Sequence, residues 1–527
     1  MPDITLIVGL LAVVIALAIL ADRIAVPYPI LLLVVGVTLG IAPGLPAIAL
    51  RPDLVFLLFL PPLLYREALT TPWRDFHANQ RSIFWLAVGL VIFTTCGIAL
   101  VAHMAIADLT WPLAFVLGAI VSSTDAVAAA SIFARLGIPI RVEVIVKGES
   151  LVNDASALVV YGTAVTAVVD GTFSLPWAAG QFVVVSLGGI AIGLAAGGLA
   201  MALRRRLRGI DPVIETAIAV LIPFAAYLPA QRVGVSGVLA VVAAGLYVGR
   251  LSPAVVPSTT RLQANAVWDL LTFLINGLVF ILIGLQLHGI LSRIASHPTG
   301  TLVLDAALIS LAVILVRMLW VFPATALSHF RQRGQTNDPA LPWRQVTVVA
   351  WSGMRGVVAL ATALALPTRA GGAPFPQRDL LIFLTFGVIL VTLLLQGLTL
   401  PRLIESLGVG EDDMQLREER LARTAAAQAA LDRLDRITDP DRWDPRLVAG
   451  LRASYARRIQ HLDAHVRGDL EEGHPQPGYE LRRELLDLER RTLIALRDRN
   501  TINDTVLQRI QRELDLEEVR IDAAMEE

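Results

Sequence analysis

Cysteine and lysine are almost absent from this chain of 527 residues, in which Cys96 and Lys147 are the only residues of their kinds. A single cysteine excludes a disulfide within the chain and a metal cluster built on several cysteines. The net charge of −1 carries no signature of nucleic-acid binding. We therefore expect no nucleic-acid partner and no resident cofactor.

Charge of either sign is also scarce. Charged residues make up 17% of the chain, whereas soluble domains carry about 25%, and the mean hydropathy is +0.65. Up to about Leu407 the chain is a series of apolar runs, each long enough to cross roughly 30 Å of hydrocarbon as a helix. After Gly410 these runs stop. The pattern predicts an all-α polytopic membrane protein, with a transmembrane domain at 1–407 and a helical tail at 408–527.

About thirteen transmembrane helices fit the apolar runs. Arginines concentrate in alternate loops, and the positive-inside rule therefore places those loops and the tail in the cytoplasm. The N-terminus is then outside a plasma membrane, and because the first span lacks a basic leading segment we expect it to be retained. The predicted spans are 4–21, 27–42, 54–67, 81–103, 112–134, 143–169, 177–203, 213–229, 234–249, 264–287, 301–327, 345–366 and 380–404.

Two carboxylates, Asp125 and Asp154, lie within consecutive spans. A charged side chain at the bilayer centre costs about 3 kcal/mol on insertion scales, so such residues usually line a polar path. Oxygen-bearing neighbours accompany both: Thr124 precedes Asp125, while Ser150 and Asn153 precede Asp154. These residues predict a site for a small hard cation or a proton. The alternative for the run SSTD is a kinked helix whose hydroxyls bond back to their own carbonyls.

Local unwinding at SSTDAV would turn backbone carbonyls inward as cation ligands. In the next span, Ser150 and Asp154 share one helix face, and Asn153 is turned toward the preceding span. Glu149 needs a cation, and Arg317 is the arginine deep within the eleventh span. We expect a buried, structural Glu149–Arg317 pair.

The twelfth span contains WSGMRG, in which Gly353 and Gly356 flank Arg355. The glycines favour a helix break, where Arg355 would place positive charge near the two acids and compensate the crossing of broken helices. The alternative is that Arg355 snorkels to the cytoplasmic surface. Span five is the fifth member of the block formed by the first to sixth spans, and span twelve is the fifth member of the block formed by the eighth to thirteenth spans. These matching positions predict two inverted repeats with the ion site between them.

The segments STDAVA, GESLVND and WSGMRG together resemble the cation:proton antiporter 1 family, which comprises bacterial sodium/proton antiporters of the NhaP type and the animal sodium/proton exchangers. FLPPLLYREAL and NGLVFILIGLQL are also similar to it. The resemblance covers the whole membrane domain. It implies a homodimer in the lipid bilayer, in which a six-helix core moves like an elevator against a dimerisation part.

The resemblance also implies residue roles. Asp154 would bind Na⁺ or protons, with Ser150 and the carbonyl or hydroxyl of Thr124 as ligands. Asp125 and Asn153 would steady the crossing of the broken helices. Glu149 with Arg317, and also Arg355, would take the charges that brace the core.

Two positions depart from the family pattern. Some archaeal members carry a glutamate where this chain has Arg66, and Glu67 follows one residue later. We hold Glu67 as a weak ligand candidate and expect an interfacial ion pair instead. The residue two before Glu149 is often acidic in the family, whereas here it is Lys147, whose charge would alter pH dependence or cation recruitment.

A single strong carboxylate beside a neutral Asn153 predicts electroneutral exchange, since one proton or one Na⁺ suffices to neutralise Asp154. Roles in pH and sodium homeostasis follow, whereas selectivity among Na⁺, Li⁺ and K⁺ depends on cavity size.

A cation channel and an intramembrane hydrolase using Asp125 and Asp154 as a dyad are the alternatives. Neither a short symmetric filter nor a catalytic motif accompanies these acids.

The sequence of the tail predicts amphipathic helices. Two of its segments repeat apolar residues at helical spacing: EERLARTAAAQAALDRLDRI and ELLDLERRTLIALRDR. A further helix is expected at about 504–524, with a loop at 473–478. These helices would support the dimer as a solvated bundle or add a pH-sensing role.

Overall fold

The computed structural model describes residues 4–24, 27–41, 55–107, 109–171, 174–206, 210–294, 298–332, 341–370, 372–410, 413–436 and 444–467, and scattered residues between 485 and 521. The chain divides into two compact units, Met1–Asp412 and Asp413–Glu527. This division falls shortly after the predicted boundary at Leu407.

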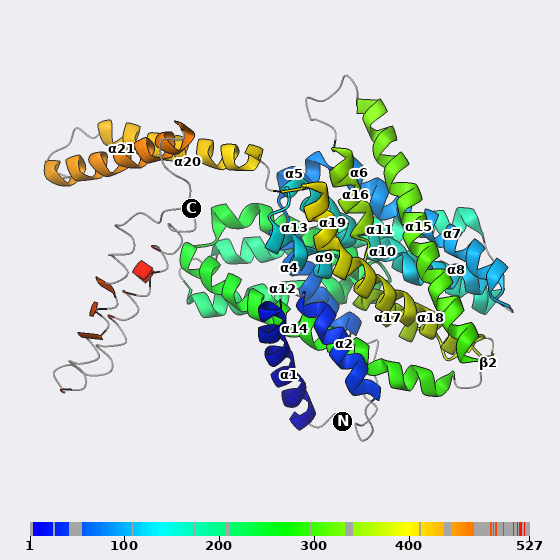
Figure 1. Ribbon diagram of the computed structural model, residues 1–527. Helices are drawn as coiled ribbons and strands as arrows, with labels where there is room; N and C mark the ends of the chain where they lie inside the picture. The colour runs from blue at the N-terminus through cyan, green and yellow to red at the C-terminus, as the bar shows by residue number, and fades with distance from the viewer. Residues whose placement is uncertain are drawn as a thin grey trace. The chain divides into compact units, whose positions relative to one another are not determined.

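The first unit is helical apart from one short hairpin (Figure 1). Its first helices are α1 (Ile4–Arg23), α2 (Tyr28–Ile41), the π-helical turn η1 (Val55–Phe59), α4 (Leu60–Thr70), α5 (Trp73–Ala78), α6 (Gln80–Phe84), the π-helical turn η2 (Trp85–Gly89), α7 (Leu90–Ala105), α8 (Trp111–Ser122), α9 (Ala126–Leu136) and α10 (Ile140–Asp170). The others are α11 (Leu175–Arg206), α12 (Pro212–Val233), α13 (Gly237–Val255), α14 (Ser258–Arg293), α15 (Thr299–Gln332), α16 (Trp343–Trp351), α17 (Val357–Leu364), α18 (Arg378–Val391), the π-helical turn η3 (Thr392–Gln396) and α19 (Gly397–Leu407). Strands β1 (Arg369–Ala370) and β2 (Ala373–Pro374) pair antiparallel.

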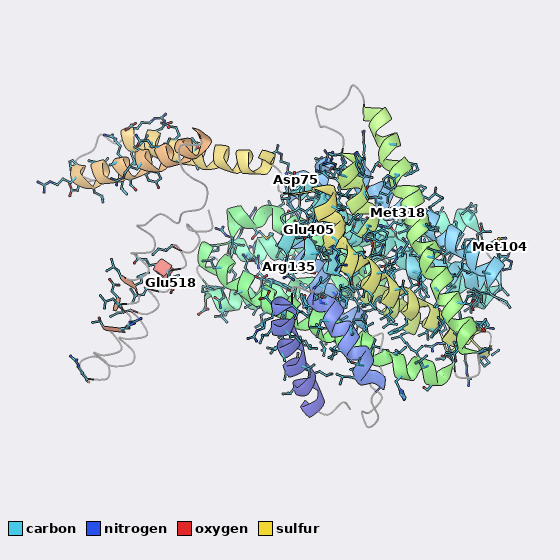
Figure 2. The ribbon with its side chains drawn as sticks, viewed as in Figure 1. Asp75, Met104, Arg135, Met318, Glu405 and Glu518 are labelled. Atoms are coloured by element: carbon cyan, nitrogen blue, oxygen red, sulfur yellow. The ribbon has the colours of Figure 1, made fainter. Side chains whose placement is uncertain are left out.

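Among the described residues, eight helical stretches are long and apolar enough to cross a membrane. They are Gln80–Ala105, Trp111–Leu136, Ile140–Asp170, Leu175–Arg206, Pro212–Val233, Thr260–Arg293, Thr299–Ala326 and Arg378–Leu407, and two shorter apolar helices are Tyr28–Gly40 and Gly237–Ser252. Side chains fill the space between the helices of this unit (Figure 2). The chain is thus a multi-pass membrane protein, and the count of thirteen spans and the inverted repeats stay predictions.

Glycine allows α11 and α13 to pack closely along their length. A Cβ built on Gly193 would overlap the carbonyl of Ala240 on α13, so only glycine permits this approach. Small residues are common where helices associate in lipid, because dispersion contacts there take over from the hydrophobic effect. The glycines of the seventh predicted span, 177–203, therefore serve close helix packing.

In the second unit, α20 (Asp413–Asp435) packs against α21 (Pro445–Arg467). Helix α20 covers the first tail segment predicted to be helical. Sequence reasoning did not single out α21. The predicted loop at 473–478 lies outside the described residues, as does most of the two later tail helices.

Candidate functional site

Two interrupted helices cross in the first unit. The break between α8 and α9 spans Ser123–Asp125, and the break between α16 and α17 spans Ser352–Gly356. The amide of Asp125 donates a hydrogen bond of 2.8 Å to the carbonyl of Met354, which joins the breaks directly. Both interruptions predicted from sequence are present. The crossing brings four helix ends together, two carrying partial positive charge and two carrying partial negative charge.

Asp125 accepts hydrogen bonds from the N-terminal ends of α9 and α17. Its carboxylate accepts a hydrogen bond of 2.8 Å from the amide of Val127 in α9 and another from the amide of Val357 in α17. An aspartate at a helix N-terminus satisfies orphan amides and complements the helix dipole. A Cβ built on Gly356 would collide with this carboxylate. Gly356 is therefore needed for the close approach of the two breaks.

Arg355 donates hydrogen bonds to the C-terminal ends of α8 and α16. Its Nε donates to the carbonyl of Val121 in α8 at 3.0 Å, and its Nη1 donates to the carbonyl of Gly353 just beyond α16. The side chain is 1% exposed, so it does not snorkel to a surface. The hydrogen bonds described for it go to carbonyl oxygens rather than to Asp125 or Asp154. Arg355 is therefore held by hydrogen bonds to the helix ends, and not by hydrogen bonds to the acids near which it was expected.

Asp154 lies on α10 facing the first break. Its carboxylate is 3% exposed and accepts a hydrogen bond from the hydroxyl of Ser123. Sequence reasoning noted Ser123 only as a polar neighbour and did not include it in the site. The polar run SSTD contained the information needed to find Ser123, because any polar side chain at the first break can face Asp154.

Asn153 is 1% exposed and donates its amide hydrogen to the hydroxyl of Thr124, toward the preceding span as expected. Its Oδ1 has no hydrogen-bond donor among the described residues. An unpaired buried carbonyl-type oxygen is costly unless something else satisfies it. This oxygen, on the residue preceding Asp154, is suited to a small hard cation.

Thr124 and Ser150 are occupied by protein contacts. The hydroxyl of Ser150 donates to the carbonyl of Thr124 at 3.1 Å and accepts from the amide of Ala126 at 3.3 Å. The Thr124 hydroxyl donates to Glu149 Oε1 at 3.2 Å. Within the run SSTD, Ser122 does bond back to its own helix, at 2.7 Å to the carbonyl of Ala119, as the alternative of a kinked helix expects. Ser123 and Thr124 instead donate to Asp154 and Glu149 on α10, so the alternative is wrong for these two hydroxyls. They bind the first break to α10.

Glu149 and Arg317 form a bidentate ion pair in which both side chains are 1% exposed. Arg317 also donates to the carbonyls of Val349 and Ala350 at the end of α16, at 2.9 and 3.1 Å. The structure therefore contains the expected pair. Because all three guanidinium nitrogens of Arg317 donate hydrogen bonds, the pair ties α10, α15 and α16 together and leaves neither charge stranded.

Glu67 lies half-buried on α4, within electrostatic range of Lys147, Asp125 and Asp154. The structure describes no ion pair for Glu67 within 4 Å among the residues it covers. Instead, its neighbour Arg66 pairs with Asp269 at 2.6 Å, and Lys147 pairs with Glu143 one turn earlier. The expected interfacial ion pair of Glu67 is therefore not found among the described residues, and its carboxylate lies within electrostatic range of Asp125 and Asp154.

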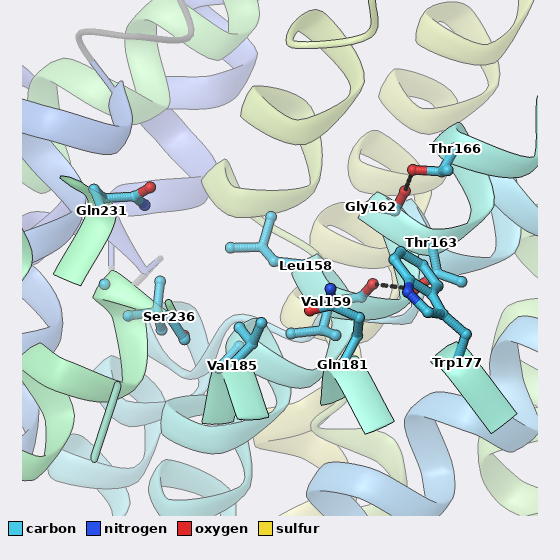
Figure 3. Close-up of a pocket in the computed structure, with 13 residues that line it drawn as sticks. Leu158, Val159, Gly162, Thr163, Thr166, Trp177, Gln181, Val185, Gln231 and Ser236 are labelled. Atoms are coloured by element: carbon cyan, nitrogen blue, oxygen red, sulfur yellow. Dashed lines mark hydrogen bonds between the residues drawn. The ribbon is translucent and has the colours of Figure 1, made fainter. Parts of the chain in front are cut away.

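A cavity of about 350 Å³ approaches the site along α10 (Figure 3). It lies between α10, the start of α11 and the connection from α12 to α13. Its lining includes Ala155, which follows Asp154 directly in the sequence, although Asp154 itself is not among the lining residues. Polar side chains line it, including Thr163, Gln181 and Gln231. No group of three or more His, Cys, Asp or Glu side chains gathers as a metal site in the part of the chain the structure describes.

Comparisons with known proteins agree on one family. The family described as "Sodium/hydrogen exchanger, transmembrane" matches residues 9–406. An uncharacterised Na⁺/H⁺ exchanger of Mycobacterium tuberculosis H37Rv is 39% identical over 98% of this chain and 95% of its own length. The Bacillus subtilis sodium, potassium, lithium and rubidium/H⁺ antiporter is 34% identical over 76% of this chain and 62% of its own length.

The fold also has a solved counterpart. The sodium proton antiporter MjNhaP1 of Methanocaldococcus jannaschii superposes with a TM-score of 0.58 and 19% sequence identity, covering 77% of this chain and 98% of that one. At this identity the likeness concerns the fold.

Proposed function

The chain belongs to the sodium/hydrogen exchanger family, and from this premise we propose that it is a secondary antiporter that exchanges Na⁺ for protons across the plasma membrane. The observation that carries the proposal is Asp154, a carboxylate 3% exposed beside the unpaired Oδ1 of Asn153. A proton and a cation both neutralise such a carboxylate. They therefore compete for it, and competition at one site couples the two fluxes.

Electroneutral exchange follows from the charge count at the site. Glu149 is compensated by Arg317, and Asp125 lies at two helix N-termini, so Asp154 is the acid left to its transported ligands. An empty, ionised Asp154 would have to cross a region of low dielectric, at a cost of several kcal/mol. Movement of the neutralised site alone then gives one cation per proton.

The site residues take two kinds of role in this proposal. Asp154 binds Na⁺ or the proton, with Asn153 Oδ1 and Ser123 beside it, while Thr124 and Ser150 hold the first break against α10 and offer further oxygens. Glu67 is available as an outlying carboxylate within electrostatic range. The assignment rests on the hydrogen bonds and burial described above.

Alternating access is proposed to be of the elevator type within a homodimer, with the N-terminus outside and the tail in the cytoplasm. The cavity that is lined by Ala155 is then the route from the outer face. The names of relatives that also transport potassium, lithium or rubidium support testing those cations. Roles in pH and sodium homeostasis follow from the exchange.

Proton movement in everted membrane vesicles tests the proposal. Addition of NaCl, LiCl or KCl should release protons from loaded vesicles containing the wild type, and Asp154→Asn should abolish the response because its amide cannot exchange a proton for a cation. Asp211→Asn is a matched control, since Asp211 caps α12 away from the site. Undiminished exchange by a folded Asp154→Asn variant would refute the central role of Asp154. Cation currents without proton movement would identify a channel instead.

A further inference from the structure

The short helix α5 lies between two parts of the first unit (Figure 1). It follows α4 after only Thr71 and Pro72, and it contacts both α10 and α13. Helix α10 carries Asp154, whereas α13 packs against α4 and α11. A helix that touches both parts is placed to restrain any movement between them.

Glycines hold α4 and α13 together. A Cβ built on Gly249 would overlap the carbonyl of Leu69, and one built on Gly245 would press on the methyl group of Ala68. Helices whose backbones approach this closely over a full turn have little freedom to slide past each other. Helices α4 and α13 thus form one rigid pair.

Helices α5 and α6 are fixed to α10 instead. The ring of Phe76 and the side chain of Ile83 lie against Gly148, where an added Cβ would come within 3.2 and 2.7 Å of them. Asn79, buried between α5 and α6, accepts a hydrogen bond of 3.1 Å from Arg141 Nε on α10. Gly148 begins the segment GESLVND, so α5 contacts α10 at the segment that carries the proposed ion site.

A charged contact crosses from the rigid pair to α5. The guanidinium of Arg250, near the end of α13, lies 5.4 Å from the centre of the Trp73 ring on α5. Arg250 is exposed and Trp73 is 37% exposed, so water competes for both. Stacking of arginine on an indole ring at such a site is attractive but weak enough to break and re-form. Phe76 and His77 stack beside Trp73, with ring centres at 6.4 and 6.1 Å, and keep its ring in place.

We propose that Arg250 and Trp73 form a latch at the cytoplasmic end of the unit. The latch holds α5 and α10 against α13, and it opens whenever α10 moves relative to α13. This inference rests on the proposed alternating access, which requires such a movement. Thr71 and Pro72 serve as the joint, because they separate the rigid pair from the helices fixed to α10. A static contact, in contrast, persists in every state of the protein.

Distances between spin labels on α5 and α13 test the latch in the full-length protein. Labels on Ala78→Cys and Ser252→Cys, in a Cys96→Ser background in lipid nanodiscs, should report a major short distance and a minor longer one. Trp73→Leu removes the ring and should raise the ratio of the long to the short population about two- to fivefold, as expected for loss of one exposed cation–π contact. Arg250→Gln should raise it by a similar factor.

Matched variants separate the latch from a general effect on stability. Arg344→Gln removes a cation that lies 5.9 Å from the ring of Trp343 on its own helix, α16, and it should leave both populations unchanged. The double variant Trp73→Leu, Arg250→Gln should shift the populations no further than either single change, because the same contact is lost in all three. A single unchanged distance in every protein, or an equal shift in Arg344→Gln, overturns the latch.

Cation-driven proton release by the same proteins separates this inference from the proposed function. Shifted populations in a protein that shows no exchange would support the latch and refute antiport. Exchange by the wild type, with populations that do not respond to Trp73→Leu or Arg250→Gln, would refute the latch and leave antiport standing.

Discussion

At the scale of single residues, the site is defined by how each buried charge is neutralised. Glu149 and Arg317 neutralise each other, whereas Asp154 has only the hydroxyl of Ser123 among its described hydrogen bonds. A residue with a permanent counterion cannot exchange ligands readily, and one without a counterion must acquire a proton or a cation. Burial and pairing together therefore distinguish a structural acid from a transporting one, although both occur in the same segment, GESLVND.

The Glu149–Arg317 pair gives a prediction about stability. Arg317→Leu should destabilise the protein by about 3–5 kcal/mol, because it leaves the Glu149 carboxylate buried without a counterion. The double variant Glu149→Leu, Arg317→Leu should recover part of that loss, since no charge is then stranded. Thermal unfolding in detergent of the wild type, the single variants Arg317→Leu and Glu149→Leu, and the double variant measures this coupling. Additive losses in the double variant would contradict the pairing as the source of the effect.

At the scale of elements, the two broken helices are useful because their ends have opposite partial charges. Asp125 meets two N-termini and Arg355 meets two C-termini, so each side chain neutralises a pair of helix ends at once. The carbonyls and amides released by unwinding are thereby satisfied without water. The region beside Asp154 can consequently stay polar and ordered within a hydrophobic environment.

Gly356→Ala tests this crossing. The added methyl group collides with the Asp125 carboxylate, so the breaks must separate and exchange should fall at least tenfold even though no charge changes. Gly162→Ala is the matched control, because a Cβ there meets no atom within 4 Å. Cation-driven proton release in vesicles, corrected for the amount of folded protein, is the measurement. Equal activity of both alanine variants would show that the close approach is dispensable.

At the scale of the whole molecule, all residues of the proposed ion site belong to the first unit, and the second unit is a separate compact unit. Within the first unit, the cavity along α10 lies between α10, the start of α11 and the connection from α12 to α13. A cavity between elements leaves room for their relative movement. Because the cavity is lined by Ala155, next to Asp154 in the sequence, we propose it as the route by which ions approach Asp154 without crossing lipid.

Cysteine labelling tests the outer route. In a Cys96→Ser background, Thr163→Cys should react with a membrane-impermeant thiol reagent applied to the outside of right-side-out vesicles, and the adduct should slow exchange severalfold by filling the cavity. Ser131→Cys, on α9, is the control and should not react from that side. Reaction of Thr163→Cys only from the cytoplasmic side would reverse the proposed orientation of the cavity.

The sequence by itself determined the membrane class, the two helix breaks and the Glu149–Arg317 pair, and it placed Asp154 beside the first break. Those features follow from hydrophobicity, helical spacing and the high cost of charge in lipid, which act locally along the chain. Only the tertiary structure decided that Ser123 bonds Asp154, that Arg355 binds carbonyls and that Glu67 forms no ion pair with any residue the structure describes. These depend on which helix ends meet and which side chains face each other across helices, and local spacing does not encode such long-range neighbours.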